Sequence, residues 1–133
     1  MIENASGQHA AGVVVIVDDD EAIGTALSRL VRTIGHQPRL FRSAEALLRE
    51  IGNFLPSCII TDIQMPHMNG LDLIKELTKR DVKAPVMVMT AYPSLANREL
   101  ALQAGASEYL TKPLDIERLE AWLIKVDSTQ RRL

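Results

Sequence analysis

The sequence alternates five times between a short strand-like segment and a longer segment with helical periodicity. The strand-like segments cover residues 13–17, 38–41, 58–61, 85–89 and 108–111, of which the first, third and fourth are almost wholly apolar. Short apolar runs of this kind, rich in β-branched side chains, are typical of strands in a parallel sheet. Five rounds of strand and helix predict an α/β domain in which helices cover both faces of the sheet.

Residues that typically begin or end helices flank the segments between the strands. Gly35 and Gly105 each follow an amphipathic segment and predict a left-handed helix end. Ser43 and Asp115 each precede one and predict an N-cap. In the last helix, the spacing predicts an inner stripe of Ile116, Leu119, Leu123 and Val126.

Trp122 lies beside that stripe rather than in its middle, which leaves two interpretations. Packing at the edge of the core is the favoured one. Contact with a partner is the alternative, because aromatic side chains are enriched at interfaces.

The polarity of the strands predicts their order. The first, third and fourth are almost wholly apolar and should be central, whereas the second and fifth carry Arg39 and Glu108 and should be edges. The doubly wound order 2-1-3-4-5, a flavodoxin-like three-layer sandwich, satisfies this pattern. In that order a crevice opens at the carboxyl ends of the first and third strands.

Polar residues follow four of the strands and should meet at this crevice. They are Asp18 and Asp19 after the first strand, Asp62 after the third, Thr90 after the fourth and Lys112 after the fifth. Taken singly, each has a simpler interpretation as a turn residue, a cap or a solvated side chain. Their placement at four strand ends of one sheet favours a common pocket.

The chemistry of such a pocket points to phosphoryl transfer. Clustered carboxylates repel one another unless a hard cation such as Mg²⁺ is bound between them, and Mn²⁺ could replace it. Asp62 would then attack phosphorus to form an acyl phosphate. Lys112 would pair with the phosphoryl oxygens and the Thr90 hydroxyl would donate to another.

Four motifs resemble those of the receiver domains of bacterial response regulators. They are residues 15–21, the phosphoacceptor-like segment from Asp62 to Gly70, residues 89–91 and residues 109–113. The resemblance covers residues 13–127. It implies that Asp62 is the phosphoacceptor, that Asp19 binds Mg²⁺ directly and that Asp18 binds it through water. The backbone carbonyl of Gln64 would complete the protein ligands together with Asp62.

The resemblance also implies a switch. Thr90, the backbone of Ala91 and Lys112 would sense the phosphoryl group, while Thr90 and Tyr109 would change position together. The bond before Pro113 would be cis. Pro93 departs from the family pattern, which often has a more flexible residue there, so the mobility of the loop after the fourth strand is open.

The partners follow from the same resemblance. The donor would be a phosphohistidine on a sensor histidine kinase, and the output face would comprise the helix 95–104, the strand 108–111 and the last helix. That face would act on an output domain or a partner protein, and the phosphorylated form could be a homodimer. Residues 41–48 resemble receivers fused to transcriptional output domains, so we expect the N-terminal part of a transcription regulator, with a stand-alone receiver as the alternative.

Two other classes fit less well. A magnesium-dependent phosphatase with an aspartyl nucleophile usually has a second Asp two residues later, where this chain has Gln64. A flavodoxin-like cofactor binder would need a glycine-rich phosphate loop where this chain has three aspartates. The chain is thus expected to be a phosphoacceptor, which catalyses only its own phosphorylation and slow dephosphorylation, rather than an enzyme.

Composition sets the remaining expectations. A net charge of −2 gives no basis for direct nucleic-acid binding, and no apolar run is long enough to cross a membrane. Cys58 is the only cysteine and lies in an apolar run, which indicates a buried, inert thiol in a reducing cytoplasm. Residues 1–12 are expected to be a flexible leader, 13–127 the domain, and 128–133 a tail or the start of a linker.

Overall fold

The predicted strands form one parallel sheet in the computed structural model, which describes residues 12–131. In chain order the strands are β1 (Val13–Val17), β2 (Gln37–Phe41), β3 (Cys58–Asp62), β4 (Val86–Thr90) and β5 (Glu108–Thr111). Across the sheet the order is β2-β1-β3-β4-β5. The doubly wound α/β fold and its strand order are therefore confirmed, with β2 and β5 at the edges.

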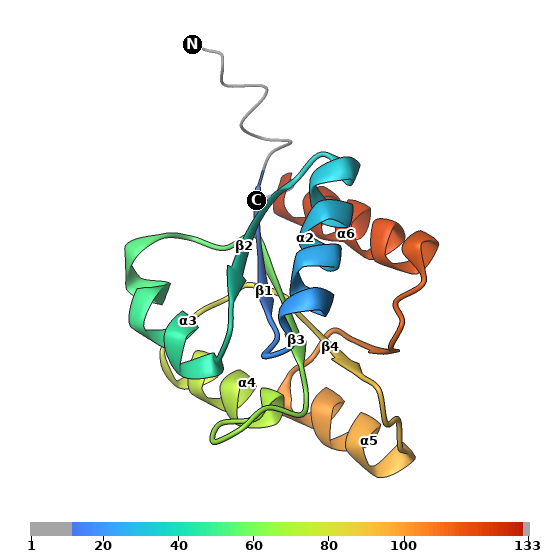
Figure 1. Cartoon of the computed structure of the whole chain (residues 1–133). Helices are drawn as coiled ribbons and strands as arrows, with labels where there is room; N and C mark the ends of the chain where they lie inside the picture. The colour runs from blue at the N-terminus through green and yellow to red at the C-terminus, as the bar shows by residue number, and fades with distance from the viewer. Residues whose placement is uncertain (1–11, 132–133) are drawn as a thin grey trace.

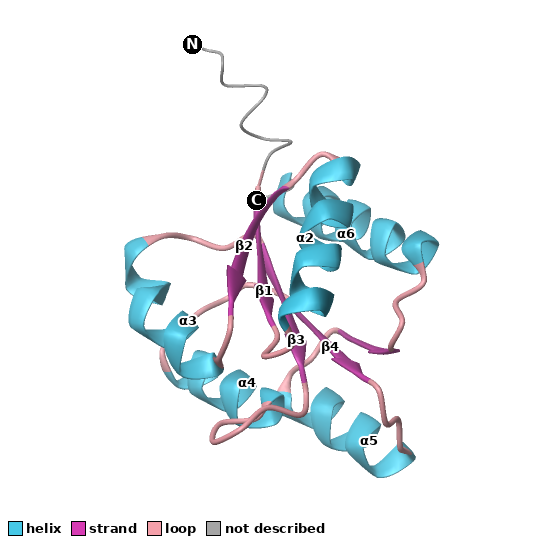
Figure 2. Cartoon of the chain, viewed as in Figure 1, coloured by secondary structure: helices cyan, strands magenta, loops and turns pink. Residues whose placement is uncertain are grey.

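Helices cover both faces of this sheet (Figure 1). They are α2 (Glu21–Ile34), α3 (Ala44–Glu50), the 3-10 turn η1 (Ile51–Asn53), α4 (Gly70–Lys79), α5 (Leu95–Ala104) and α6 (Ile116–Arg131). Figure 2 shows α2 and α6 together on one side, with α3, α4 and α5 on the other. The helix α6 continues past Asp127 to Arg131. The predicted leader, apart from Gly12, lies outside the described residues.

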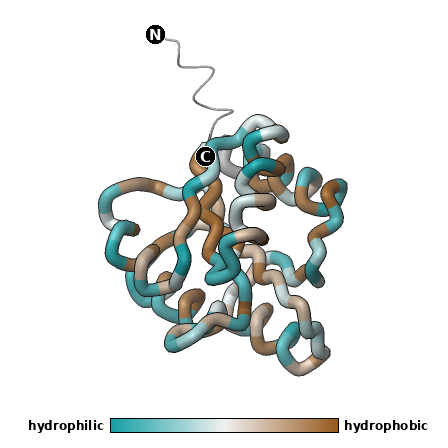
Figure 3. Tube along the Cα trace, viewed as in Figure 1, coloured by the Kyte–Doolittle hydropathy of each residue, from teal (hydrophilic) through white to brown (hydrophobic). Residues whose placement is uncertain are grey.

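The alternation of side chains along the strands divides the core into two layers. Val15 and Val17 pack into the cluster beneath α3, α4 and α5. Val14 and Ile16, one position away, pack into the cluster beneath α2 and α6. Both faces of a central strand are thus buried, which explains its continuous apolar sequence. Figure 3 shows the apolar colour along the central strands and a mixture of polar and apolar colours along the helices.

The predicted helix ends are confirmed. Gly35 and Gly105 end α2 and α5 with φ of 109° and 117°, a left-handed conformation that glycine adopts without a Cβ clash. The Ser43 hydroxyl accepts a hydrogen bond from the Ala46 backbone N–H at 3.0 Å. The Asp115 carboxylate accepts one from the Glu117 backbone N–H at 2.8 Å, at the start of α6.

The inner stripe of α6 differs from the prediction at two positions. Ile116 is 57% exposed, so its assignment to the stripe is wrong, while Trp122 is only 5% exposed. The buried stripe of Leu119, Trp122, Leu123 and Val126 is centred about 70° around the helix from Ile116. Ile116 instead lines a groove beside Ile23 of α2.

Trp122 is part of the core. Its indole Nε1–H donates to the Ser107 hydroxyl at 3.0 Å, so the polar atom of a buried side chain is satisfied. The interpretation as a packed residue is confirmed and that as a partner contact is wrong.

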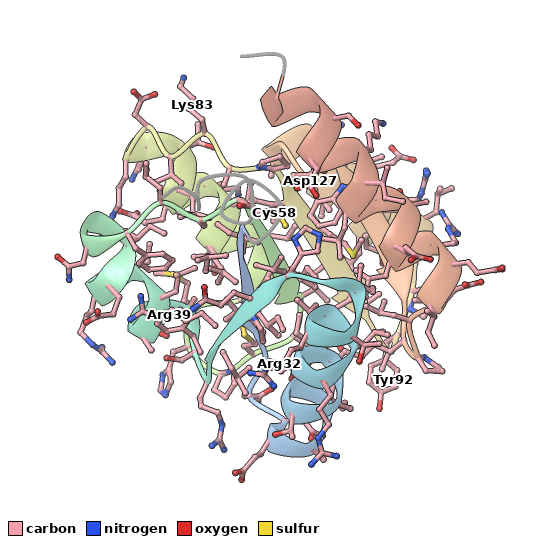
Figure 4. All side chains as sticks on the ribbon, turned by 90° about the horizontal axis from the view of Figure 1, so that it is seen from above. Arg32, Arg39, Cys58, Lys83, Tyr92 and Asp127 are labelled. Atoms are coloured by element: carbon pink, nitrogen blue, oxygen red, sulfur yellow. The ribbon has the colours of Figure 1, made fainter. Side chains whose placement is uncertain are left out.

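Cys58 is buried, as predicted. Figure 4 places it in the interior near Asp127, whereas Lys83 lies at the periphery. Burial, reinforced by the Asp127 charge, raises the pKa of the Cys58 thiol to about 12, so this thiol is not ionised at neutral pH. Within residues 12–131 no helix is both long and apolar enough to cross a membrane.

Two truncations in α6 test this packing. Leu119→Ala is expected to lower the free energy of unfolding by about 2–5 kcal/mol, because Leu119 is fully buried. Ile116→Ala, in the same helix, should change it by less than about 0.5 kcal/mol. Urea unfolding followed by circular dichroism measures both. A larger loss for Ile116→Ala than for Leu119→Ala would contradict the observed orientation of the helix.

Candidate functional site

Three aspartates meet where the direction of the chain connections reverses, at the carboxyl ends of β1 and β3. The two strands are parallel neighbours, with Val17 of β1 opposite Thr61 of β3. Asp18 and Asp19 follow β1 directly, and Asp62 is the last residue of β3. This is the position at which doubly wound sheets bind ligands.

The three carboxylates form a compact acidic group. One oxygen from each of Asp18, Asp19 and Asp62 lies within 4.8 Å of the others. Asp18 is fully buried and Asp62 nearly so, whereas Asp19 is exposed. Oxygen ligands at this spacing suit a hard divalent cation, so the acidic group can bind a metal.

Lys112 lies against two of these carboxylates. Its Nζ donates to Asp18 Oδ2 at 2.9 Å and to Asp62 Oδ2 at 3.1 Å. The Lys112 backbone N–H donates to the Thr90 carbonyl at 2.8 Å, which fixes the lysine at the ends of β4 and β5. The Lys112 side chain is 12% exposed, so this contact is largely shielded from water.

Burial and charge have opposite effects on the pKa values of Asp62 and Lys112. Burial raises the pKa of Asp62, and the hydrogen bond and charge of Lys112 lower it without outweighing burial. Burial alone would lower the pKa of Lys112, but hydrogen bonds to Asp18 and Asp62 outweigh it and raise the pKa. One ammonium group therefore stays charged between two carboxylates that it only partly neutralises, and the site favours additional positive charge.

The backbone around Asp62 is fixed from two sides. The buried Thr61 hydroxyl donates to the Asp62 carbonyl at 3.0 Å, and the Gln64 N–H donates to Asp62 Oδ1 at 3.3 Å. The first residue of α4, Gly70, packs so closely that a Cβ there would lie 2.5 Å from the Asp62 carbonyl oxygen. Only glycine allows this approach without a shift of the backbone.

A family model described as the response regulator receiver domain matches residues 14–124. The chain belongs to this family. Its receiver domain is 38% identical over 107 residues to the response regulator protein TmoT of Ectopseudomonas mendocina, which covers 80% of this chain and 49% of TmoT. It is 37% identical over 110 residues to the DNA-binding transcriptional regulator NtrC of Azospirillum brasilense, which covers 83% of this chain and 23% of NtrC. The chain thus spans half or less of the length of these relatives.

Solved structures of receiver domains have the same fold. A CheY-like receiver domain from Methanospirillum hungatei is 28% identical with a TM-score of 0.83, covering 92% of this chain and 99% of that one. The FixJ-N structure is 27% identical with a TM-score of 0.79, covering 89% and 94%. Receiver domains are signalling domains that work with sensor kinases.

The other residues singled out in the sequence lie around the receiver's acidic group. Thr90 ends β4, next to Met89, which pairs with Asp62, and its hydroxyl oxygen accepts the Tyr92 N–H at 3.0 Å. Ala91 is exposed and lines a groove with Lys112. The Lys112–Pro113 peptide bond is cis.

Tyr109 lies within β5, before the carboxyl end of the strand at which Lys112 follows. Its ring is half-buried against the cluster beneath α3, α4 and α5, and its hydroxyl accepts the Ser94 N–H at 3.3 Å. The structure thus links Tyr109 to the start of α5 rather than to the acidic group directly.

Sequence reasoning missed three residues that hold the site. Thr61 and Gly70 act on the Asp62 backbone as described above, and Asp20 caps α2 through its side chain. The signal for Asp20 was its position before an amphipathic segment, which is typical of an N-cap. The close approach of Gly70, at the start of α4, to the end of β3 has no local signal in a single sequence.

The raised pKa of Asp62 predicts a stability change on removing its charge. In the absence of divalent cations, Asp62→Asn should be more stable than the wild type at pH 7. A raised folded-state pKa means that the contribution of Asp62 to stability is fully present below about pH 3.9 and is lost as the pH rises through the folded-state value. The advantage of the variant should therefore shrink toward pH 4.

Urea unfolding with a chelator at pH 4 and pH 7 measures this difference. Asp81→Asn, at an exposed acid that pairs with Lys83, is the control and should change little. An Asp62→Asn variant less stable than the wild type at pH 7 would contradict the direction of the pKa shift.

Proposed function

We propose that Asp62 of this receiver domain accepts a phosphoryl group from a phosphohistidine on a sensor histidine kinase. The observation that carries the proposal is the Asp62 carboxylate itself, which lies within 4.8 Å of two other carboxylates and accepts a hydrogen bond from the Lys112 ammonium. An acid with only a structural role at a strand end does not require neighbouring carboxylates and an ammonium group. A nucleophile that accepts a highly charged group does require charged groups around it.

In the transfer, one carboxylate oxygen of Asp62 bonds to phosphorus as the bond from phosphorus to the donor's imidazole nitrogen breaks. The electron pair of the broken bond returns to that nitrogen, so no oxidant or further reactant is required. The phosphoryl oxygens then add negative charge next to Lys112, whose ammonium is already within 3.1 Å of Asp62. The lysine is therefore in place to bind a phosphoryl oxygen as a point charge.

The donor atoms present fit Mg²⁺, and Mn²⁺ could replace it. Asp19 and Asp62 would coordinate the ion directly, Asp18 through water, and the backbone carbonyl of Gln64 would be a further ligand. When bound, the ion offsets the charge that develops on the phosphoryl oxygens during transfer. The excess of carboxylates over ammonium groups supports a cation at this position.

The signal would pass from Thr90 and Ala91 to Tyr109. The Thr90 hydroxyl oxygen already accepts one hydrogen bond, which leaves its proton free to donate to a phosphoryl oxygen. The backbone of Ala91, next in the chain, would contact the same group. Movement of Thr90 and its loop would release the contact between Ser94 and Tyr109 and allow the ring to turn.

The output surface would be the face of α5, β5 and α6. Two large apolar side chains of these elements, Leu95 of α5 and Ile124 of α6, are exposed. Exposed apolar groups favour contact with a protein partner, whether an output domain, a separate protein or a second phosphorylated copy. We expect this face to bind its partner differently after Thr90 and Tyr109 move.

The longer relatives favour a role in transcription. TmoT and NtrC extend well beyond the matched region, and NtrC is by its name a DNA-binding transcriptional regulator. We therefore propose that this receiver is the regulatory part of such a protein in the cytoplasm and does not itself bind nucleic acid. A stand-alone receiver is the alternative. Gln64, in place of a second acid, argues against turnover as a phosphatase.

Intact-mass analysis after incubation with acetyl phosphate and Mg²⁺ tests the chemistry. The wild type should gain the mass of one phosphoryl group, and Asp62→Asn should gain none. Asp81→Asn, which keeps the acidic group intact, should react like the wild type. Phosphorylation of Asp62→Asn to the wild-type extent would disprove the assignment of the acceptor.

A second experiment tests the coupling through Thr90. Thr90→Ala should still take up the phosphoryl group, but the amide NMR shifts of α5 and β5 should change much less on phosphorylation than in the wild type. Thr111→Ala is the matched control, because exposed Thr111 lies opposite Thr90 in the sheet. A full response in Thr90→Ala would show that the signal takes another route.

A further inference from the structure

The three consecutive aspartates after β1 have different surroundings. Asp18 and Asp19 belong to the acidic group. Asp20 is instead the N-cap of α2, in an extended conformation, and its carboxylate accepts the Ile23 N–H at 3.1 Å. The side chains of Asp18 and Asp19 thus belong to the acidic group, whereas the side chain of Asp20 caps α2.

The backbone of Asp20 joins the helix to the acidic group. Its N–H donates to Asp18 Oδ1 at 2.9 Å, and its carbonyl accepts the Gly24 N–H at 3.0 Å. Asp18 is thereby held on both of its carboxylate oxygens, by Asp20 on one and by Lys112 on the other. The cap and the buried acid are parts of one hydrogen-bonded turn.

Asp19 lies between these two fixed residues. Within residues 12–131, the Asp19 carboxylate has neither a hydrogen bond nor an ion pair to another side chain or to the backbone. Its side chain is also exposed, so packing does not hold it. The position of this carboxylate beside Asp62 therefore depends on the backbone turn that Asp18 and Asp20 fix.

We propose that Asp20 is a positioning residue that sets the cation affinity of the site by holding the turn that carries Asp18 and Asp19. The inference rests on the proposed function in one respect, namely that the acidic group binds a divalent cation. The side chain of Asp20 acts through the α2 cap and not as a ligand. Outer partners that orient metal ligands typically contribute about 10–100-fold to metal affinity.

A competing explanation is that Asp20 attracts the cation through its charge alone. The two explanations are separated by a pair of variants. Asp20→Asn keeps a side-chain oxygen that caps a helix well but removes the charge, whereas Asp20→Ala removes both. Positioning predicts that Asn restores the affinity that Ala loses, while a charge effect predicts that both variants weaken binding equally.

Ser43→Ala provides the matched control for general loss of stability. Ser43 caps α3 through a hydrogen bond of 3.0 Å to the Ala46 N–H, comparable to the cap that Asp20 makes. Its removal should lower the thermal midpoint by a similar amount as Asp20→Ala. It should leave the cation affinity within about twofold of the wild type, because α3 contributes no residue to the acidic group.

Titration of residues 1–133 with Mn²⁺ alone, with the free ion followed by electron paramagnetic resonance, measures the affinity without any phosphorylation. We expect Asp20→Ala to bind about tenfold more weakly than the wild type, and Asp20→Asn to stay within about twofold of it. Affinity of Asp20→Ala within twofold of the wild type would overturn the proposal. So would equal weakening in both variants, or a wild type that binds no Mn²⁺ at millimolar concentration.

A second measurement separates a positioning effect from a damaged site. With acetyl phosphate, Asp20→Ala should need about tenfold more Mg²⁺ for half-maximal phosphorylation but should reach the wild-type rate when the ion is saturating. A saturated rate that remains tenfold low would overturn the proposal. If the wild type bound Mn²⁺ with the expected pattern across the variants but took up no phosphoryl group, only the proposed function would fail.

Discussion

The Lys112 ammonium lies between the buried carboxylates of Asp18 and Asp62, and the rest of the site is arranged around this contact. Three carboxylates cannot all be ionised at this spacing without a compensating charge. The lysine supplies part of it and remains charged, yet burial still raises the pKa of Asp62. This incomplete neutralisation is the physical reason for proposing that the site binds a cation and, with it, an incoming anionic group.

The fold provides this contact because all five strands are parallel and the connections leaving β1 and β3 run in opposite directions across the sheet. Residues 94 positions apart, Asp18 and Lys112, meet because β1, β3, β4 and β5 are parallel neighbours whose carboxyl ends share one edge. Two apolar layers, one on each face of the sheet, keep the strands in register. Close contacts such as that of Gly70 with the Asp62 carbonyl then fix the remaining backbone. The site therefore depends on packing that lies mostly outside it.

Much of this arrangement could be predicted from the sequence. The polarity of Arg39 and Glu108 identified the edge strands, and parallel order alone required Asp18, Asp62 and Lys112 to converge. The orientation of α6 could not be predicted as well, because Ile116 and Trp122 are both near the border of the apolar stripe and tertiary packing decides which is buried. The position of Asp20 before an amphipathic segment is typical of an N-cap, but the hydrogen bond from its backbone N–H to Asp18 depends on the folded turn and has no signal in the sequence.

The most direct test of the account is to locate the phosphorylated side chain chemically. Borohydride reduces an acyl phosphate on aspartate to homoserine, which remains at its position after proteolysis and can be identified by tandem mass spectrometry. After incubation with acetyl phosphate and Mg²⁺, homoserine is expected at position 62. Homoserine at position 18 or 19 instead, or none in a chain that has gained the mass of a phosphoryl group, would contradict the account.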